Sequence, residues 1–353
     1  MIKLLHSADW HLDSPLLFRD SRQAEALRSA LSRIPEKVAT LCKDQGCDLL
    51  LLSGDLFDGP YTPNTLRNVQ NALEEVSVPV FISPGNHDFI GADSPWLTEN
   101  FPKNVHIFTQ PVMGSVAVPH LDCRIYGAGF AHMDCPGLLE NFTPEHTERY
   151  GIGVLHGDPT QVNSPYNPIT RAQVSQSGLD YLALGHIHKG DQFHAGKTLC
   201  AWPGCPMGRG YDETGDKGVL LVTLEDTAAA EFISLGLPQF HDLEMDASLS
   251  PDAALPSVGN SDFYRLTFTG PSEPLDLDKI AADLSHFPNL ELRDRTTPPV
   301  DIWGSAEEDT FEGMYFRQLR TAMENAEESQ KQQFLLAAKL SRQLLDGQEV
   351  VLP

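Results

Sequence analysis

Five apolar stretches of this sequence are each followed by a histidine, an aspartate or an asparagine. In the clearest case, LALGHIHKG at residues 182–190, two histidines stand one residue apart after an apolar run and a glycine. Imidazole nitrogens and carboxylate or amide oxygens are donors that first-row divalent metal ions bind. The candidate metal ligands are Asp9, His11, Asp55, Asn86, His156, His186 and His188.

The number of these donors predicts two metal ions, because seven side chains are too many for one ion. A carboxylate can bridge two cations, whereas an imidazole cannot. Asp9 and Asp55 are therefore the candidate bridging ligands, and Asp55 is favoured. Mixed imidazole, carboxylate and amide ligation suits Mn²⁺, Fe or Zn, of which we expect Mn²⁺. The donor set contains no thiolate and is unlike a closed structural zinc site.

Two such ions are suited to the hydrolysis of phosphoesters. Held about 3.5–4 Å apart, they lower the pKa of a shared water and stabilise the charge that builds on the phosphoryl oxygens. His87 follows Asn86 directly and is not needed as a ligand, so it is the candidate acid for the leaving group. Asp58, three residues after Asp55 in GDLFD, is the candidate partner that orients His87 and raises its pKa.

An α/β architecture would position these side chains. Apolar spacing predicts a helix between the first two strands and another at residues 63–76. In open α/β sheets, ligands bind beyond the carboxyl ends of the strands. The apolar stretches predict buried strands at residues 2–5, 49–52, 78–82, 152–155 and 181–184.

Two pairs of donors are spaced one residue apart. We expect Asp9 and His11 to point to one side of the chain, because alternate residues of an extended segment do so. The same argument applies to His186 and His188. Both pairs are thereby predicted to reach into one crevice.

The composition changes toward the C-terminus. Residues 236–262 are rich in Pro, Ser and Asp and are predicted to form a linker. We expect a metal-binding domain over residues 1–240 and a smaller α+β domain over residues 241–353. The elements expected in the second domain are a strand at 263–269, a helix at 275–285, a strand at 290–295 and one or two helices within 307–346.

The net charge of −24 argues against a general affinity for DNA or for anionic membranes. Two divalent ions would bring about +4 and two ligand carboxylates would remove about 2 of it, so the crevice itself would attract phosphate. The six cysteines form no CxxC motif, the N-terminus does not resemble a secretory signal, and we found no apolar run near 18 residues. We therefore expect reduced thiols, a cytoplasmic location and no membrane association.

The blocks Asp-x-His, GDLFD, GNHD, LHGD and GHIH, in this order, resemble the calcineurin-like metallophosphoesterase superfamily over roughly residues 1–225. The resemblance implies a four-layer αββα sandwich with a binuclear centre at the strand ends. It also implies that His87, supported by Asp58, acts on the leaving group or the transition state. It assigns Asp9, His11, Asp55 and His188 to the first metal, and Asp55, Asn86, His156 and His186 to the second.

Within this superfamily, HSADWHLDSP, GDLFD and the added C-terminal domain are similar to the SbcD-type DNA repair exonucleases. The segment WPGCPMGRGYDETGDKGVLLVTL is similar to the YhaO-like subgroup of that family. This resemblance implies Mn-dependent nuclease or phosphodiesterase activity on DNA. It further implies a partner ATPase of the SMC-like type with a long coiled coil.

The sequence leaves other functions open. The same chemistry fits a small phosphoester or a cyclic nucleotide, which would need a closed pocket where DNA needs an open trough. A regulatory or scaffold subunit of an ATPase complex, with incidental catalysis, is a further alternative. Exonuclease and endonuclease action are both compatible with the motifs, and so is a homodimer.

Structural roles can explain four further residues near the motifs. Trp10 is expected to pack beside the site, although a tryptophan can also stack a base. Asp88 and Asp158 are expected to orient neighbouring ligands or to cap turns. Arg209 fits either a contact to a phosphate or a structural salt bridge.

Overall fold

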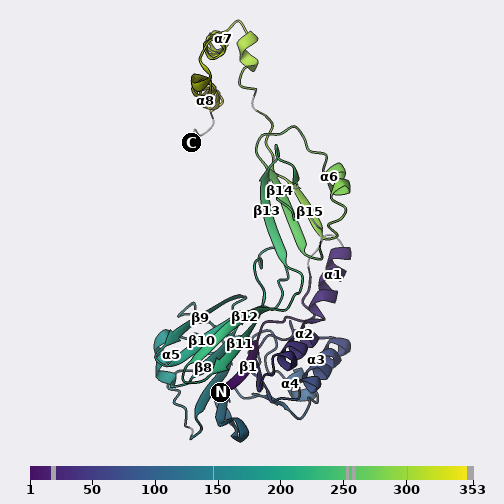
Figure 1. The fold of residues 1–353 in the computed structure, drawn as a ribbon, viewed down its shortest axis with the longest axis vertical. Coiled ribbons are helices and arrows are strands. Elements are labelled where there is room, and N and C mark those ends of the chain that lie inside the picture. Colours follow the sequence, from purple (N-terminus) through teal and green to yellow (C-terminus); the bar gives the residue numbers. More distant parts are fainter. Residues whose placement is uncertain (17–20, 146, 252–253, 257–259, 300, 348–353) are drawn as a thin grey trace. The chain divides into compact units, whose positions relative to one another are not determined.

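The computed structural model describes residues 1–16, 21–145, 147–251, 254–256, 260–299 and 301–347 (Figure 1). Two six-stranded sheets dominate it. The first sheet has the order β12 (Ala228–Ser234), β11 (Gly218–Leu224), β1 (Ile2–Ser7), β2 (Leu49–Leu52), β3 (Val80–Ile82) and β4 (Val105–Ile107). The second has the order β5 (Gly114–Val118), β6 (Cys123–Gly127), β7 (Tyr150–His156), β8 (Tyr181–Gly185), β10 (Thr198–Gly204) and β9 (Lys189–Ala195).

The five strands predicted before the donor residues are confirmed as β1, β2, β3, β7 and β8. In the first sheet β1, β2 and β3 are parallel neighbours, with Leu4 beside Leu49 and Leu50 beside Val80. In the second sheet β7 and β8 are parallel neighbours. Because parallel strands end at the same edge of a sheet, the donors after these strands gather at one edge of each sheet.

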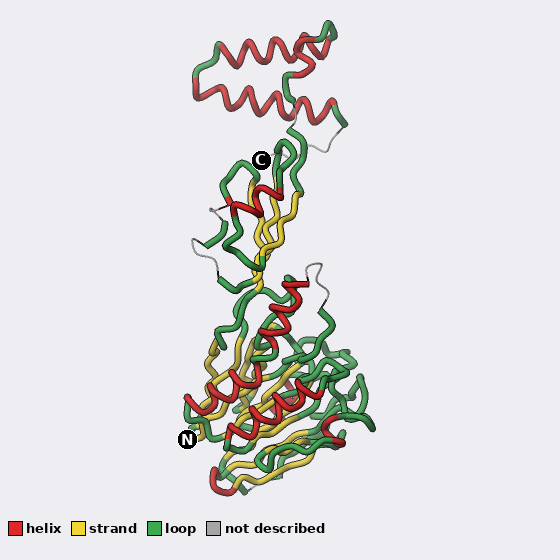
Figure 2. Tube along the Cα trace, turned by 90° about the vertical axis from the view of Figure 1, so that its right-hand side faces the viewer, coloured by secondary structure: helices red, strands yellow, loops and turns green. Residues whose placement is uncertain are grey.

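Alternating leucines build a four-layer αββα sandwich, as the resemblance implies. Leu50 and Leu52 pack with residues of the helices that cover the first sheet, whereas Leu49 and Leu51 pack with residues of the second sheet. On the outer face of the second sheet, Leu182 packs with apolar residues around a short helix. Figure 2 shows helices lying against the strands. The helices in this part of the chain are α1 (Ser21–Leu31), α2 (Ile34–Asp44), α3 (Pro63–Val76), α4 (Pro95–Thr98) and α5 (Arg171–Ser177).

The predicted helix at residues 63–76 is confirmed as α3, which begins after Thr62. The Thr62 hydroxyl accepts a hydrogen bond from the backbone N–H of Thr65, as expected of an N-cap. The helix expected between the first two strands is in fact two helices, α1 and α2. Pro35 lies in the first turn of α2, where a proline is favoured because its missing N–H is not needed.

The C-terminal region contains a three-stranded sheet and further helices. The predicted linker at 236–262 is wrong in part, because it contains the first strand of this sheet, in which Phe240 and Met245 are buried. The edge strands β9 and β12 were also not predicted, since most of their residues are exposed and lack an apolar pattern. Among the described residues, 3-10 turns lie at Pro119–Leu121 and Gly304–Glu307. The remaining elements are β13 (Phe240–Asp246), β14 (Phe263–Thr269), α6 (Leu277–Asp283), β15 (Leu290–Asp294), α7 (Phe311–Glu324) and α8 (Glu328–Leu345).

The chain divides into two compact units. One comprises residues 1–243, 258–265 and 285–291, and the other comprises residues 244–257, 266–284 and 292–353. Strands β13, β14 and β15 contribute residues to both units, so the division at residue 240 stays a prediction. Within the part of the chain that the structure describes, no helix has the length and apolar character needed to span a membrane.

Candidate metal centre

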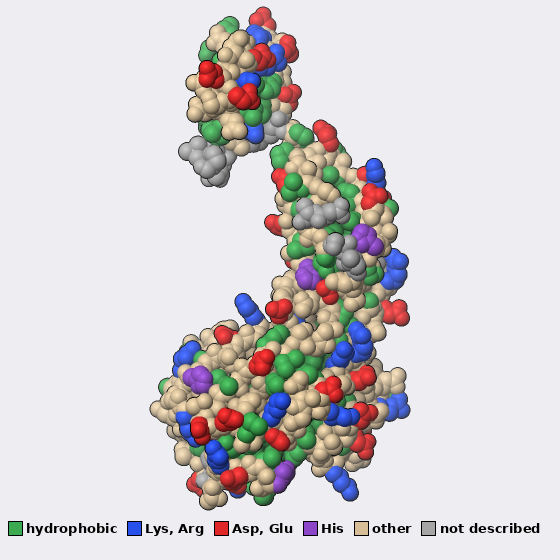
Figure 3. Space-filling view, in the orientation of Figure 1, with side chains coloured by type: hydrophobic (Ala, Val, Ile, Leu, Met, Phe, Trp, Pro, Cys, Tyr) green, Lys and Arg blue, Asp and Glu red, His purple; other side chains and the backbone are tan. Residues whose placement is uncertain are grey.

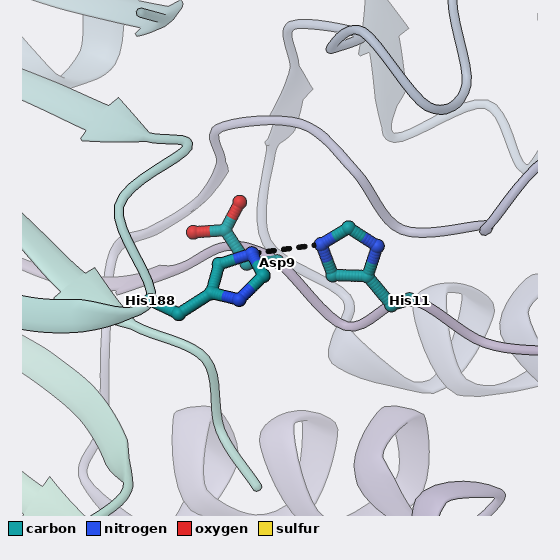
Figure 4. A group of neighbouring side chains, drawn as sticks. All are labelled: Asp9, His11 and His188. Carbon is teal, nitrogen blue, oxygen red and sulfur yellow. Dashed lines mark hydrogen bonds between the residues drawn. The ribbon is translucent and has the colours of Figure 1, made fainter. Parts of the chain in front are cut away.

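Three of the predicted ligands form a first cluster at the ends of β1 and β8. The donor atoms of Asp9, His11 and His188 lie within 4.8 Å of one another. The two imidazoles approach edge to edge, with 3.0 Å between their Nε2 atoms, and the Asp9 carboxylate lies beside them (Figure 4). A cation placed among these atoms would meet two ring nitrogens and one carboxylate.

A second cluster forms around the Asn86 side chain. Its Oδ1 lies 3.0 Å from Nε2 of His156 and 3.2 Å from Nδ1 of His186. The Asp55 Oδ2 atom lies 3.3 Å from the same His156 nitrogen. The structure therefore brings together all seven side chains that the sequence predicts as ligands, in two neighbouring groups.

Asp55 lies between the two clusters. Its Oδ2 is 3.3 Å from Nε2 of His156 and 3.7 Å from Nε2 of His11. Its Oδ1 accepts a hydrogen bond from the backbone N–H of His87 at 2.9 Å. Asp9 is also close to both groups, and its carboxylate accepts the backbone N–H of His186. Both carboxylates lie close to donors of both clusters, and the bridging role preferred for Asp55 stays a prediction.

The chemistry of the donor set fits a pair of cations. The His156 Nδ1 faces the Ser53 carbonyl at 2.9 Å, so in the neutral ring Nδ1 donates and Nε2 keeps its lone pair. That lone pair faces the oxygens of Asn86 and Asp55, which are acceptors as well. Buried acceptors directed at one another repel unless positive charge lies among them. Divalent cations would supply that charge.

The backbone at the donors is unusual and corrects one sequence argument. Asp9, His11, Asp55 and His186 have φ angles of 55°, 46°, 54° and 100°. Left-handed φ is uncommon in residues other than glycine, costs about 1–3 kcal/mol each and is concentrated at functional sites. The expected extended geometry of the paired donors is therefore wrong. Tight turns bring these side chains together, and His186 and His188 join different clusters.

Backbone packing and one buried carboxylate hold the His156 ring and the loop that carries Asp55. A Cβ on Gly54, whose φ is +93°, would lie 2.5 Å from the His156 Nδ1, and one on Gly85 would lie 2.8 Å from it. The buried Asp88 carboxylate accepts backbone N–H bonds from Gly85 at 2.7 Å and from Leu56 at 2.8 Å. The orienting role predicted for Asp88 matches these contacts.

The other residues near the motifs have structural contacts. Asp158 caps a turn by accepting the backbone N–H and the hydroxyl of Thr160. Trp10 is buried and donates its indole N–H to the Ser7 hydroxyl, so it is not available to stack a base. The packing expected of Trp10 is confirmed.

His87 and Asp58 are in contact at the edge of the first cluster. The His87 Nδ1 lies 2.5 Å from Oδ1 of Asp58, and the same oxygen lies 3.3 Å from Nδ1 of His11. The His87 side chain is 42% exposed, whereas that of Asp58 is 11% exposed. The hydrogen bond to Asp58 raises the pKa of His87, although partial burial opposes it. Burial raises the pKa of Asp58, but hydrogen bonds from the two imidazoles outweigh burial and lower it.

Arg209 and Glu213 complete the surroundings of the centre. Arg209 forms ion pairs with Asp58 at 3.6 Å and with Glu213 at 3.0 Å, which favours the structural reading of this arginine. Glu213 was not predicted, yet its Oε1 lies 2.6 Å from Nδ1 of His188. One signal was available: a metal-binding imidazole usually donates its other N–H to a carboxylate, and acidic residues follow GHIH in GRGYDETG.

The sequence profile of the Calcineurin-like phosphoesterase family matches residues 2–190, more than half of the chain and all seven predicted ligands. The chain belongs to this family. Family membership and the geometry together show a site for two metal ions built mainly from histidine and aspartate. Membership also indicates a metal-dependent phosphoesterase.

Two relatives from Bacillus subtilis (strain 168) are similar to this calcineurin-like phosphoesterase. The uncharacterized metallophosphoesterase YhaO is 31% identical over 247 residues, covering 63% of this chain and 57% of the relative. The SbcD component of the nuclease SbcCD is 25% identical over 263 residues, covering 61% of this chain and 64% of the relative. The chain thus spans less than two thirds of either relative. Among solved structures, a dimetal phosphatase from Danio rerio has a TM-score of 0.43 at 10% identity, covering 66% of this chain and 99% of that one.

Proposed function

We propose that this protein is a two-metal phosphodiesterase that uses Mn²⁺ and cleaves DNA as the nuclease subunit of a repair complex. The observation that supports the chemistry is the convergence of seven donors into two clusters with Asp55 between them. The metal ligands proposed are those predicted from the sequence. His87 is the proposed acid, and Asp58 is the residue that orients it.

The proposed mechanism divides the work between the ions and the side chains. Bound divalent ions would supply an activated water and charge stabilisation for the phosphoryl oxygens. Asp58 holds Nδ1 of His87, so Nε2 is the ring nitrogen that faces a substrate. His87 donates a proton from Nε2 to the departing oxygen, and Asp58 stabilises the protonated ring before the transfer.

DNA is proposed as the substrate because one of the two relatives is named as part of a nuclease. The other, YhaO, is named only as a metallophosphoesterase and is the more similar in sequence. The charge of −24 acts against DNA binding, and on the face shown in Figure 3 acidic and basic side chains are interspersed. Attraction to phosphate would then depend on the bound ions or on a partner.

A substrate comparison tests this proposal. The purified protein is incubated with linear single-stranded and double-stranded DNA, and in parallel with a chromogenic phosphodiester and a phosphomonoester. Each reaction is run with Mn²⁺, with Zn²⁺ and with a chelator. We expect Mn²⁺-dependent cleavage of DNA and of the diester. Activity on the small esters alone would identify a small-molecule phosphoesterase, and inactivity on all of them would favour a regulatory or scaffold subunit.

Metal binding is expected to stabilise the fold. An ion that binds only the folded state adds about 2.7 kcal/mol to the free energy of unfolding at a concentration of 100 times its Kd. Mn²⁺ should therefore raise the melting temperature of chelator-treated protein, and excess chelator should reverse the change. The measurement is thermal unfolding, monitored by the circular dichroism signal. An unchanged melting temperature across a Mn²⁺ titration would contradict the proposed centre.

For the partner, we propose an SMC-like ATPase that docks its coiled coil on the hairpin of α7 and α8. The hairpin buries a small core around Phe316, yet Phe311 is 87% and Leu344 is 66% exposed. These two residues line a groove of about 300 Å³ together with Tyr315 and Leu345. An uncovered apolar groove between helices fits an amphipathic partner helix. We also propose that residues 241–353, which contain this hairpin, form an accessory domain.

The docking proposal is tested by co-expression with an SMC-like ATPase from the same genome. Co-elution in gel filtration is expected for the wild type and should be lost in Phe311→Glu/Leu344→Glu. The control is Val162→Glu, which places one such glutamate on an exposed apolar residue far along the chain from the hairpin. If the protein alone elutes as a dimer that the double variant dissociates, the surface joins two copies of this chain instead.

A further inference from the structure

Glu213 and Arg209 lie behind the first cluster, outside the residues that match the family. Both are in the segment between β10 and β11, whereas the family match ends at residue 190. The Glu213 Oε1 lies 2.6 Å from Nδ1 of His188 and 3.0 Å from the Arg209 guanidinium. Its Oε2 accepts the backbone N–H of Arg209 at 2.8 Å. Both carboxylate oxygens of Glu213 are therefore engaged, and the side chain is fixed.

The contact to Glu213 determines which nitrogen of His188 is available. A neutral imidazole carries one N–H, and a carboxylate at Nδ1 keeps that proton there. The lone pair is then on Nε2, which lies 3.0 Å from Nε2 of His11 (Figure 4). The His11 ring is held in the same way, because its Nδ1 faces Asp58 at 3.3 Å. Two carboxylates thus direct two lone pairs to one point.

Arg209 links these two carboxylates. One terminal nitrogen lies 3.6 Å from Oδ2 of Asp58, and the other lies 3.0 Å from Oε1 of Glu213. The nitrogen near Asp58 also donates to the Ser14 hydroxyl at 3.4 Å. One guanidinium therefore holds in place both acids that orient the imidazoles of the first cluster.

The second cluster is supported differently. The His156 ring is oriented by the Ser53 carbonyl rather than by a carboxylate on Nδ1. Among the contacts of the described residues, none joins Glu213 or Arg209 to Asn86, His156 or His186. A substitution of Glu213 should therefore change the metal affinity of the first cluster only.

We propose that Glu213 and Arg209 are positioning residues that set the affinity of the Asp9, His11 and His188 cluster for its metal ion and leave the other cluster unaffected. The inference rests on the proposed two-metal function. Orienting partners of this kind change metal affinity about 10–100-fold. The expected effect is therefore large for one ion and small for the other.

Isothermal titration of metal-free protein with Mn²⁺ tests this inference without reference to activity. The wild type should show two classes of bound ion. Glu213→Ala should weaken one class about 10–100-fold and the other by less than twofold. Glu213→Gln should weaken the same class less, since its amide oxygen still accepts the His188 N–H. Arg209→Gln should act in the same direction. The affected class should be the one that His188→Gln removes.

The matched control is Glu148→Gln. Glu148 pairs with Arg124 near the start of β7, at the opposite end of the sheet from the centre, and its side chain is 13% exposed against 11% for Glu213. This variant should bind both ions as the wild type does. Equal weakening of both classes in Glu213→Gln, or no weakening in Glu213→Ala, would overturn the proposal. Wild-type protein that binds two ions but cleaves no phosphodiester would contradict the proposed function alone, and wild-type protein that binds fewer than two ions would contradict both.

Discussion

Asp55→Asn is expected to abolish Mn²⁺-dependent hydrolysis of a generic phosphodiester, with a loss of about 10³-fold or more. The substitution keeps the shape of the side chain and an oxygen for the His87 backbone N–H, but it removes the negative charge from between the two clusters. Metal ions contribute several kcal/mol of charge stabilisation to the transition state, and each 1.36 kcal/mol is a factor of ten in rate. The measurement is steady-state hydrolysis together with the metal content of the purified protein.

The control for this experiment is Asp180→Asn. Asp180 accepts the backbone N–H of Gly151 and pairs with Lys197. It directly precedes β8, so it lies at the end of the sheet away from the donors. The activity of the Asp180→Asn variant should remain close to that of the wild type. An Asp55→Asn protein that kept wild-type rates would show that Asp55 is not a bridging ligand.

His87→Gln is expected to lower turnover by about 10²–10⁴-fold while leaving the metal content unchanged. A positioned acid or base contributes about this factor, and His87 is in contact with Asp58 rather than part of either cluster of donors. Turnover is measured with the chromogenic diester, and metal content by elemental analysis. His194→Gln, which alters an exposed histidine near the distal end of β9, should change neither quantity.

The role of Asp58 can be separated from that of His87 by a double-mutant cycle. If Asp58 acts through His87, the loss in Asp58→Asn/His87→Gln should be smaller than the product of the two single losses. Asp58→Asn should also weaken metal binding, because the same carboxylate holds His11. Should His87→Gln lose metal and turnover in equal measure, His87 would be a ligand instead of an acid.

The strands and the gathering of donors could be predicted from the sequence because both depend on local pattern. A run such as Leu49–Leu52 is buried on both faces, and parallel strands of one sheet end at the same edge. The way in which the donors meet could not be predicted. An alternating spacing such as that of His186 and His188 suggests extended chain, whereas the φ of His186 is 100°. Backbone dihedrals of this kind depend on packing that the local pattern does not contain.

Elements without an apolar pattern were also beyond prediction. Strand β9 is mostly exposed, and β13 lies in a segment whose composition indicates a linker. Glu213 was missed for a related reason. Acidic residues do follow GHIH in GRGYDETG, but in a chain of net charge −24 nothing local distinguishes the one that contacts His188. Its importance becomes visible only when the chain between β10 and β11 folds back against His188.

The packing of Gly54 and Gly85 against the His156 ring has a consequence for recombination between relatives. The two glycines follow strands of the first sheet, whereas the ring ends β7 of the second sheet. One sheet therefore supplies the main-chain surface on which an imidazole of the other rests. A chimera joined in the loop between β4 and β5 would combine the main chain at Gly54 and Gly85 from one parent with the His156 ring from the other. Viable crossovers are expected to be rare there unless both parents share this backbone path.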